Sequence, residues 1–427
     1  MKISLACASL LLFLAAGCGK PAGPPSAEGF APLEAGAALF WDRQTTESGQ
    51  LLRAIGEEFN TGWKGLPIKI ERAGAYGEIF RKTTASIAAK KLPAMSVAYE
   101  SMTAEYIPKG AVATLDDFVA SFSKEEIEDF FPAVLESNRF AEYGGKYYSF
   151  PYTKSILMMY YNKRVLEGAG VAKAPETWDE FLDACRKVKA KTGKPAYAAS
   201  ADCSTIDGMT FSRGGDIADG RSTLFDAPAS VRVFEFLEQL KKEDLVYQIT
   251  PGTFDDEVAL VNDQIAFTIR TSSSLGGLAR QFEDVSRWGM ARLPQEDPAH
   301  PHTVLFGANV SIFNVGDEQQ KTAKAFLKNF VSTENSVRWA IGTGYLPIRK
   351  SAAEHPDLKA FWAKAPYNRA AFDCLAFARV EPNVAGWQEV RKAVEDAETA
   401  VLTGVKTGKE AAAQLKKAAD AILSRHQ

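Results

Sequence analysis

One short segment of the chain concentrates side chains that can hold a small polar molecule without reacting with it. Residues 145–164 read GKYYSFPYTKSILMMYYNKR, with five tyrosines, Pro151 and Lys154 beside an apolar run. A tyrosine offers a flat apolar ring and one hydroxyl group, which suits the face and the hydroxyls of a sugar or polyol. Asp42, which follows another apolar run, carries a carboxylate that can accept a bond from a ligand hydroxyl or cap the next helix. These residue types favour noncovalent binding.

The usual signatures of hydrolases and metalloenzymes are missing from the sequence. The chain has only four histidines, His300, His302, His355 and His426. None stands in a metal-binding pattern or beside a serine-nucleophile motif. We therefore expect no enzyme, no metal and no cofactor. A secreted glycosidase is the enzymatic alternative, because two catalytic carboxylates can meet in space from distant parts of a sequence.

The elements that would position these residues alternate between strands and helices. Residues 37–43, 66–74 and 94–100 are typical of strands, and residues 47–60 and 77–91 between them have the apolar spacing of helices. This order predicts an α/β lobe with a mainly parallel sheet. At 427 residues, the chain exceeds the size at which a single core stops growing, so we expect at least two lobes.

Further elements follow in the second half. Residues 177–193 predict a helix that ends at Gly193, and residues 302–315 predict two strands around Gly307. Residues 319–347 predict two helices closed by Gly344, and the tail from residue 387 is helical with one interruption. The composition is that of an ordinary soluble protein, with 24% charged residues and a net charge of −3. No basic stripe is present, which argues against a nucleic-acid partner.

The first residues are typical of an export signal. Residues 1–17 combine one lysine with a short apolar run, and the ending LAAGC is similar to a bacterial lipoprotein cleavage box. This predicts lipidation of Cys18 and anchoring to a bacterial membrane, on the periplasmic or the cell-surface side. The alternative is an ordinary signal peptide with an incidental cysteine. Residues 18–35, rich in Gly, Pro and Ala, predict a flexible tether. The cysteines further along are Cys185, Cys203 and Cys374, which allow at most one disulfide and lack zinc-ligand spacing.

Four segments in order resemble the extracellular solute-binding proteins of bacterial ABC importers. They are residues 148–181 (YSFPYTKSILMMYYNKRVLEGAGVAKAPETWDEF), 306–310 (FGANV), 342–352 (GTGYLPIRKSA) and 379–390 (RVEPNVAGWQEV). The branch is the carbohydrate type, which includes the maltose- and glycerol-3-phosphate-binding proteins, and the likeness covers about residues 37–427.

The resemblance implies an α/β, two-lobed periplasmic-binding-protein fold with three hinge crossings and a ligand cleft between the lobes. Lobe one would comprise residues 36–150 and 305–347. Lobe two would comprise residues 151–304 and 348–427, with crossings near residues 150, 305 and 347. Residues 148–155 would then form a hinge strand at the floor of the cleft, which Pro151 stiffens and where Tyr152 faces the ligand.

The resemblance also implies ligand contacts at individual positions. Similarity to the glycerol-3-phosphate-binding branch points to Tyr76, Glu100, Ser155, Ser272, Gly307, Tyr345 and Arg379. Lys154 and Arg270 stand where the relatives have small or polar residues, and residues 199–208 lack the tryptophans of that branch. Two added cations beside the cleft indicate either an anionic ligand or ion-paired surface charges.

The function implied is that of a monomeric substrate-binding lipoprotein of an ABC importer. It would capture a carbohydrate or related polyol by hinge closure and deliver it to the permease subunits. An alternative in the same fold is a binder of glycerol 3-phosphate or a glycerophosphodiester. A ligand-loaded receptor subunit for a sensor kinase would share the fold as well.

Overall fold

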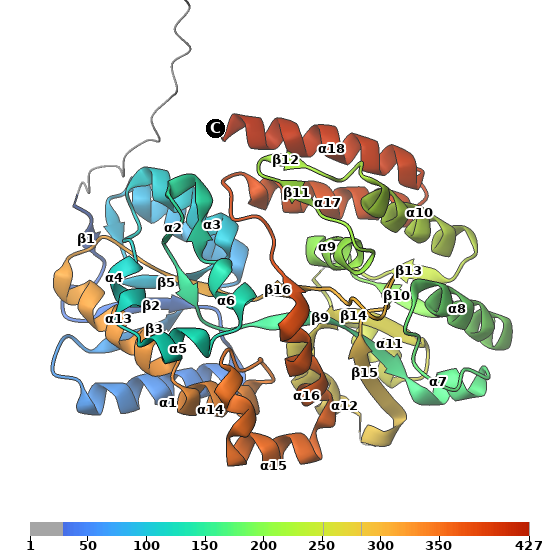
Figure 1. The fold of residues 1–427 in the computed structure, drawn as a ribbon, viewed down its shortest axis with the longest axis horizontal. Coiled ribbons are helices and arrows are strands. Elements are labelled where there is room, and N and C mark those ends of the chain that lie inside the picture. Colours follow the sequence, from blue (N-terminus) through green and yellow to red (C-terminus); the bar gives the residue numbers. More distant parts are fainter. Residues whose placement is uncertain (1–28, 251, 283, 427) are drawn as a thin grey trace, which may run out of the picture.

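The protein has two lobes that lie side by side, joined by strands that run from one to the other (Figure 1). The structure is a computed structural model that describes residues 29–250, 252–282 and 284–426. Each lobe has a β-sheet with helices packed around it, so the predicted α/β class is confirmed.

Lobe one is built on a five-stranded sheet in the order β3-β2-β5-β17-β8. The three strands of the N-terminal part run parallel, and β17 runs antiparallel to β5. Every residue of β2, whose sequence is ALFWD, is buried. An almost uniformly apolar segment of this kind is typical of a strand in the interior of a parallel sheet. The strands are β2 (Ala38–Asp42), β3 (Ile68–Arg72), β5 (Met95–Ala98), β8 (Phe150–Pro151) and β17 (Asn309–Ile312). The main helices are α1 (Thr46–Gly62), α2 (Tyr76–Ala88), α3 (Glu100–Tyr106), α13 (Asp317–Phe330) and α14 (Thr333–Thr343). Shorter helices are α4 (Asp116–Ala120), α5 (Lys124–Glu128) and α6 (Pro132–Glu136).

Lobe two is built on a seven-stranded sheet in the order β13-β10-β14-β9-β16-β18, with β15 also paired to β9. The strands are β9 (Ser155–Asn162), β10 (Tyr197–Ala199), β13 (Val246–Gln248), β14 (Phe267–Thr271), β15 (Trp288–Arg292), β16 (Thr303–Phe306) and β18 (Ala378–Arg379). The first helices are α7 (Lys163–Gly168), α8 (Trp178–Thr192), α9 (Cys203–Ser212), α10 (Pro228–Lys242), α11 (Asp255–Val261) and α12 (Leu275–Gln281). Helices α17 (Trp387–Leu402) and α18 (Gly408–Arg425) follow near the C-terminus, after α15 (Pro356–Lys364), which contacts α14 of lobe one, and α16 (Pro366–Asp373), which contacts β15.

The predicted elements are confirmed where the apolar spacing was regular. The strand–helix order of the first hundred residues appears as β2, α1, β3, α2 and β5. Helix α8 ends at Gly193, whose positive φ of 71° is the left-handed conformation that glycine adopts easily. The helical tail from residue 387 forms α17 and α18, which pack on α10.

Three segments connect the lobes and lie against one another. The chain passes from β8 to β9 through residues 152–154, and from β16 to β17 through residues 307–308. The Thr153 amide donates to the Ala308 carbonyl at 3.1 Å, and the Leu346 amide donates to the Lys154 carbonyl at 2.9 Å. Gly307 has a φ of +105°, and a Cβ there would lie 2.3 Å from the Thr153 carbonyl oxygen.

The described chain begins with residues already packed on lobe one. Phe30 is buried in the core, and β1 (Ala31–Pro32) pairs in parallel with β4 (Lys91–Leu92). The tether predicted from the sequence extended to residue 35. In the structure, residues 30–32 pack on lobe one instead, because burial removes the apolar ring of Phe30 from water. The predicted signal peptide and Cys18 lie outside the described residues. In the part of the chain that the structure describes, no helix combines the length and apolar character needed to span a membrane.

The described cysteines are all free. Cys185, Cys203 and Cys374 are buried and unpaired with one another. The disulfide that the sequence allowed is therefore not formed among them. Two short hairpins complete the fold, β6 (Arg139–Phe140) with β7 (Lys146–Tyr147), and β11 (Ala218–Asp219) with β12 (Ser222–Thr223).

Candidate ligand-binding cleft

The carboxyl ends of three lobe-one strands place a group of polar and aromatic side chains at one edge of the sheet. Because β2, β3 and β5 are parallel, the residues that follow them meet at this edge. Asp42 and Arg43 end or follow β2, Tyr76 begins the helix after β3, and Tyr99 and Glu100 follow β5. The edge therefore collects side chains that are far apart in the sequence.

Several of these side chains carry buried polar atoms without a hydrogen-bond partner among the described residues. Asp42 is 2% exposed, and one of its carboxylate oxygens accepts a bond from the Gln44 amide at 2.6 Å. Its other oxygen, Oδ2, forms no well-aligned hydrogen bond, and neither do the hydroxyls of Tyr76 and Tyr152, although Tyr152 lies near Asp42 and Tyr76 lies near Arg43. Burial raises the pKa of Asp42 to about 6. Because buried polar groups are nearly always bonded, this set marks a place where a ligand can supply the missing partners.

Tyrosine rings and one guanidinium group form the adjoining surface. The rings of Tyr76 and Tyr99 lie 4.3 Å apart between centroids. The Arg43 guanidinium carbon lies 4.7 Å from the centre of the Tyr76 ring, and Nη1 donates to the Tyr345 hydroxyl at 3.1 Å. Tyr345 follows α14, so two separate parts of lobe one meet at Arg43.

Lys154 and Glu100 bind each other at the crossing between the lobes. The Lys154 ammonium donates to Glu100 Oε1 at 3.1 Å and to the Gly307 carbonyl at 3.3 Å. Asn309 Nδ2 donates to the same Glu100 oxygen at 2.7 Å. The Lys154 side chain is fully buried, and this burial lowers its pKa. In this conformation the predicted ligand contacts Lys154 and Glu100 are joined in an ion pair.

Two predicted serines lie beside the same crossing. Ser155 is buried and stands opposite Phe306 in the register of β9 and β16. The Ser272 hydroxyl accepts a bond from the Ile156 amide at 3.3 Å. The structure thus brings Ser155, Ser272 and Gly307 together around Lys154.

The two remaining predicted cations are bonded to carboxylates elsewhere in lobe two. Arg270 donates two bonds to the buried carboxylate of Asp256 and one to the Thr253 carbonyl. Arg379 lies on the edge strand β18 and donates to the Asp216 carboxylate and to the Gly215 carbonyl. A ligand anion would have to share these donors with the carboxylates that hold them.

The opposite wall comes from lobe two and leaves a narrow pocket between the lobes. Its lining residues include Tyr99 and Glu100 from lobe one and Ser204, Glu381 and Arg391 from lobe two. Bonds also cross the cleft: Gln388 Nε2 donates to the Ser101 hydroxyl, and the Gly386 amide donates to Glu105 at 2.7 Å. The lobes therefore touch around a small interior space.

Comparison with known proteins settles the family. Residues 54–370 match the family model described as bacterial extracellular solute-binding protein. The chain belongs to this family. The resemblance predicted from the sequence, and with it a role in solute binding, is thereby confirmed.

Named relatives of this solute-binding protein span nearly its whole length. The sn-glycerol-3-phosphate-binding periplasmic protein UgpB of Pectobacterium atrosepticum is 24% identical over 426 residues, which cover 93% of this chain and 95% of the relative. UgpB of Escherichia coli K12 is 25% identical over 394 residues, which cover 87% of this chain and 89% of the relative.

Solved structures share the fold. UgpB from Mycobacterium tuberculosis in complex with glycerophosphocholine aligns with a TM-score of 0.80 at 22% identity, covering 92% of this chain and 99% of that one. The GacH receptor of Streptomyces glaucescens aligns with a TM-score of 0.78 at 21% identity, covering 93% and 100%. The two-lobed fold predicted from the sequence is confirmed by these likenesses.

Three side chains of this solute-binding protein have ligand atoms close enough to surround a metal ion. They are Cys203, Asp207 and Glu381, whose atoms lie within 4.8 Å of one another. Arg391 already donates to both oxygens of Glu381, and its positive charge disfavours a second cation there. Burial also raises the pKa of Asp207 well above its usual range. This group is therefore better suited to bind Arg391 at the cleft wall than to bind a metal ion.

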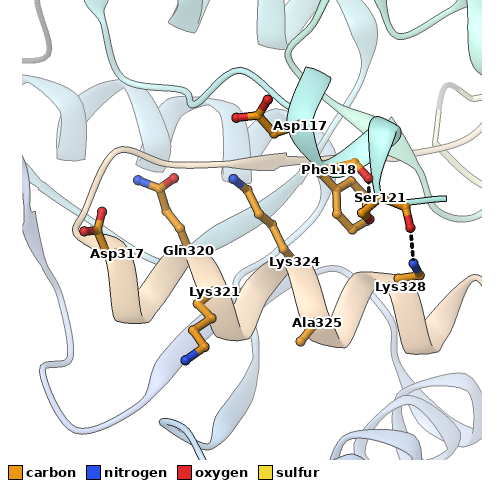
Figure 2. Close-up of a pocket in the computed structure, with 9 residues that line it drawn as sticks. All are labelled: Asp117, Phe118, Ser121, Asp317, Gln320, Lys321, Lys324, Ala325 and Lys328. Atoms are coloured by element: carbon orange, nitrogen blue, oxygen red, sulfur yellow. Dashed lines mark hydrogen bonds between the residues drawn. The ribbon is translucent and has the colours of Figure 1, made fainter.

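A second pocket lies on the outside of lobe one. Figure 2 shows it between α4 and α13, with the Lys324 side chain extending from α13 toward α4, which carries Asp117. Lys328 donates to the Ser121 carbonyl at 2.7 Å. None of the predicted site residues lines this pocket, so the cleft remains the candidate site.

Arg43, Tyr99 and Arg391 were missed at the sequence level. Arg43 and Tyr99 each adjoin a predicted contact, Asp42 and Glu100, at a strand end. Both residues are predictable as chain neighbours of these contacts, because the carboxyl ends of parallel strands meet at one edge of the sheet. Arg391 lies on α17, and no local motif marks which face of that helix meets the cleft.

Proposed function

We propose that this protein captures a carbohydrate or related polyol between its lobes, closes around it and hands it to the permease subunits of an importer. The observation that carries the proposal is the set of unpartnered buried oxygens on Asp42, Tyr76 and Tyr152 beside tyrosine ring faces. Hydroxyl groups both donate and accept, so a polyol can satisfy all three atoms. A ligand that touches both lobes stabilises the closed form by its higher affinity for that form.

A phosphorylated polyol is the second candidate. Relatives along nearly the whole chain are named for binding sn-glycerol 3-phosphate, and one structural neighbour holds glycerophosphocholine. We propose that such a ligand would occupy the same cleft, with Tyr76, Tyr345 and the crossing residues around its glycerol part. We also propose that the chain crosses from one lobe to the other near residues 150, 305 and 347.

The proposed function involves binding without catalysis. Among the three described cleft carboxylates Asp42, Glu100 and Glu381, Asp42 alone keeps an oxygen without a well-aligned partner, whereas Glu100 is bonded to Lys154 and Glu381 to Arg391. A glycosidase needs one carboxylate free to protonate and another free to attack or to activate water. The pairing of these two acids therefore supports a binding protein over the glycosidase alternative.

A ligand screen tests the proposed function directly. We expect at least one sugar, polyol or glycerophosphodiester to raise the melting temperature, because a ligand at 100 times its Kd adds about 2.7 kcal/mol of stability. Isothermal titration would measure the affinity, and small-angle scattering would show compaction on binding. In Tyr345→Phe, which removes only the hydroxyl group that accepts from Arg43, the stabilisation by the ligand should be smaller. Hydrolysis of aryl glycosides or oligosaccharides, or the absence of any stabilising compound, would contradict the proposal.

We also propose that lipid on Cys18 anchors the protein to a membrane surface. Acyl chains add roughly 0.8 kcal/mol per buried methylene, and two chains give stable attachment. Cys18→Ser is expected to move the protein into the soluble fraction and to lower its mass by the lipid. Cys7→Ser, within the predicted signal, is the matched control and should change neither. Membrane retention of the Cys18→Ser protein at unchanged mass would refute lipidation.

A further inference from the structure

The cations around the cleft differ in whether a carboxylate neutralises them. Four ion pairs account for most of them: Lys154 with Glu100, Arg270 with Asp256, Arg379 with Asp216 and Arg391 with Glu381. Arg43 forms no ion pair with any carboxylate in the described ranges 29–250, 252–282 and 284–426. The sequence alone placed the anion-binding candidates at Lys154, Arg270 and Arg379, whose charges are the ones already matched.

The side chains in direct contact with the Arg43 guanidinium group are aromatic. Its guanidinium lies over the Tyr76 ring at 4.7 Å and donates one bond, to the Tyr345 hydroxyl at 3.1 Å. Asp42, its neighbour in the chain, accepts a bond from the Gln44 amide at 2.6 Å, and its carboxylate acts on Arg43 by electrostatic attraction without a direct ion pair. Arg43 is thus partly buried at the cleft edge with no carboxylate bonded to its guanidinium group.

An arginine without a bonded carboxylate can bind an oxyanion strongly. A guanidinium group has five N–H donors in a fixed fork that fits two oxygens of one phosphate or carboxylate. Bonds between ionised groups are about twice as strong as neutral ones. An apolar ring on one side lowers the local dielectric, which strengthens the attraction for an anion that displaces water.

We propose that Arg43 binds an oxyanion group of the ligand, so that the ligand is an anionic polyol carrying a phosphate or a carboxylate. This inference rests on the proposed function, since it assumes that the cleft is where solute binds. The oxyanion lies against Arg43 and the Tyr345 hydroxyl, and the hydroxylated part extends toward Asp42 and Tyr152. The proposal places charge recognition in lobe one, at the end of the first strand of its parallel sheet.

The test compares matched charged and neutral compounds on the full protein. The pairs are glycerol 3-phosphate with glycerol, glucose 6-phosphate with glucose, and gluconate with glucose. They separate a phosphate from a carboxylate as the preferred group. We expect at least one anionic member to bind at least tenfold more tightly than its neutral partner. In Arg43→Gln that advantage should fall by about 10- to 150-fold, which is the range for losing a charged hydrogen bond.

Two further variants separate recognition from structure. Arg43→Lys keeps the charge without the fork and should lose part of the advantage. Arg379→Gln removes a cation that is already paired and should leave the advantage unchanged. Urea unfolding of each variant checks that the fold is intact. As a second readout, binding of the anionic compound should weaken with added salt in the wild type and much less in Arg43→Gln.

The outcomes distinguish this inference from the proposed function. Binding of neutral sugars or polyols alone, unchanged in Arg43→Gln, would overturn the anion proposal and leave solute capture standing. An anionic preference that survives Arg43→Gln and disappears in Arg379→Gln would overturn the assignment to Arg43. If no compound of either kind binds the wild type, both proposals fall.

Discussion

Replacing Glu100 with glutamine is expected to destabilise the ligand-free protein by about 3–5 kcal/mol, the usual cost of leaving one member of a buried ion pair without its partner. The Lys154 side chain is fully buried, and its ammonium group has only Glu100 and the Gly307 carbonyl as acceptors among the described residues. Glutamine keeps the shape and one oxygen of glutamate but removes the charge that balances the ammonium. The Gly307 carbonyl alone compensates little of that charge.

Equilibrium urea unfolding followed by tryptophan fluorescence would measure this loss. The double variant Glu100→Gln with Lys154→Met should be more stable than Glu100→Gln alone, because the unbalanced charge is then gone. Lys69→Met is the matched control, since Lys69 and its partner Glu34 are 55% and 35% exposed. An exposed pair contributes at most about 1 kcal/mol. If Glu100→Gln and Lys69→Met had equal effects, the buried pair would not have the importance that we assign to it.

Replacing Asp42 with asparagine should have the opposite effect and stabilise the ligand-free protein at pH 8. Burial raises the pKa of Asp42 from 3.8 to about 6. A carboxyl group whose pKa is higher in the folded state favours folding below its unfolded pKa, and that contribution disappears as the pH rises through 6. The difference between the two pKa values corresponds to a loss of about 3 kcal/mol in the free energy of unfolding at pH 8. Asparagine does not ionise, so the variant avoids this loss.

Urea unfolding between pH 4 and pH 8 would show this pattern. The stability difference between Asp42→Asn and the wild type should be near zero at pH 4 and should grow between pH 4 and pH 7. Asp297→Asn is a control of opposite sign, because His300 lowers the pKa of the exposed Asp297. A difference for Asp42→Asn that did not change with pH would mean that ionisation of Asp42 is not its cause. Binding of the ligand should weaken in Asp42→Asn despite the added stability, since the site loses an acceptor.

Much of the fold follows from local sequence patterns. The first strands and helices have regular apolar spacing and alternate along the chain, so their order and type could be predicted. Gly193 and Gly344 have positive φ at the ends of α8 and α14, which is a local property visible in sequence. Docking of Phe30 was not predictable in this way, because a single apolar residue in a Gly- and Pro-rich segment carries no periodicity.

The candidate site was predictable only in part, because sequence shows charges without showing their partners. The Lys154–Glu100 pair joins residues 54 positions apart, and Arg379 donates to a residue 163 positions away. Both cations therefore appeared as available charges in the sequence. The environment of Arg43 depends on Tyr345, which lies 302 positions further along. Such contacts arise only when the chain returns twice to lobe one.

The three connecting segments have a mechanical consequence. They are bonded to one another through Thr153 with Ala308 and through Lys154 with Leu346, and the missing side chain of Gly307 allows their close contact. Because these bonds oppose independent twisting or sliding of the segments, we expect one lobe to turn against the other mainly about a single axis near them. A pair of fluorescent or spin labels, one on each lobe, would follow the whole motion through one distance.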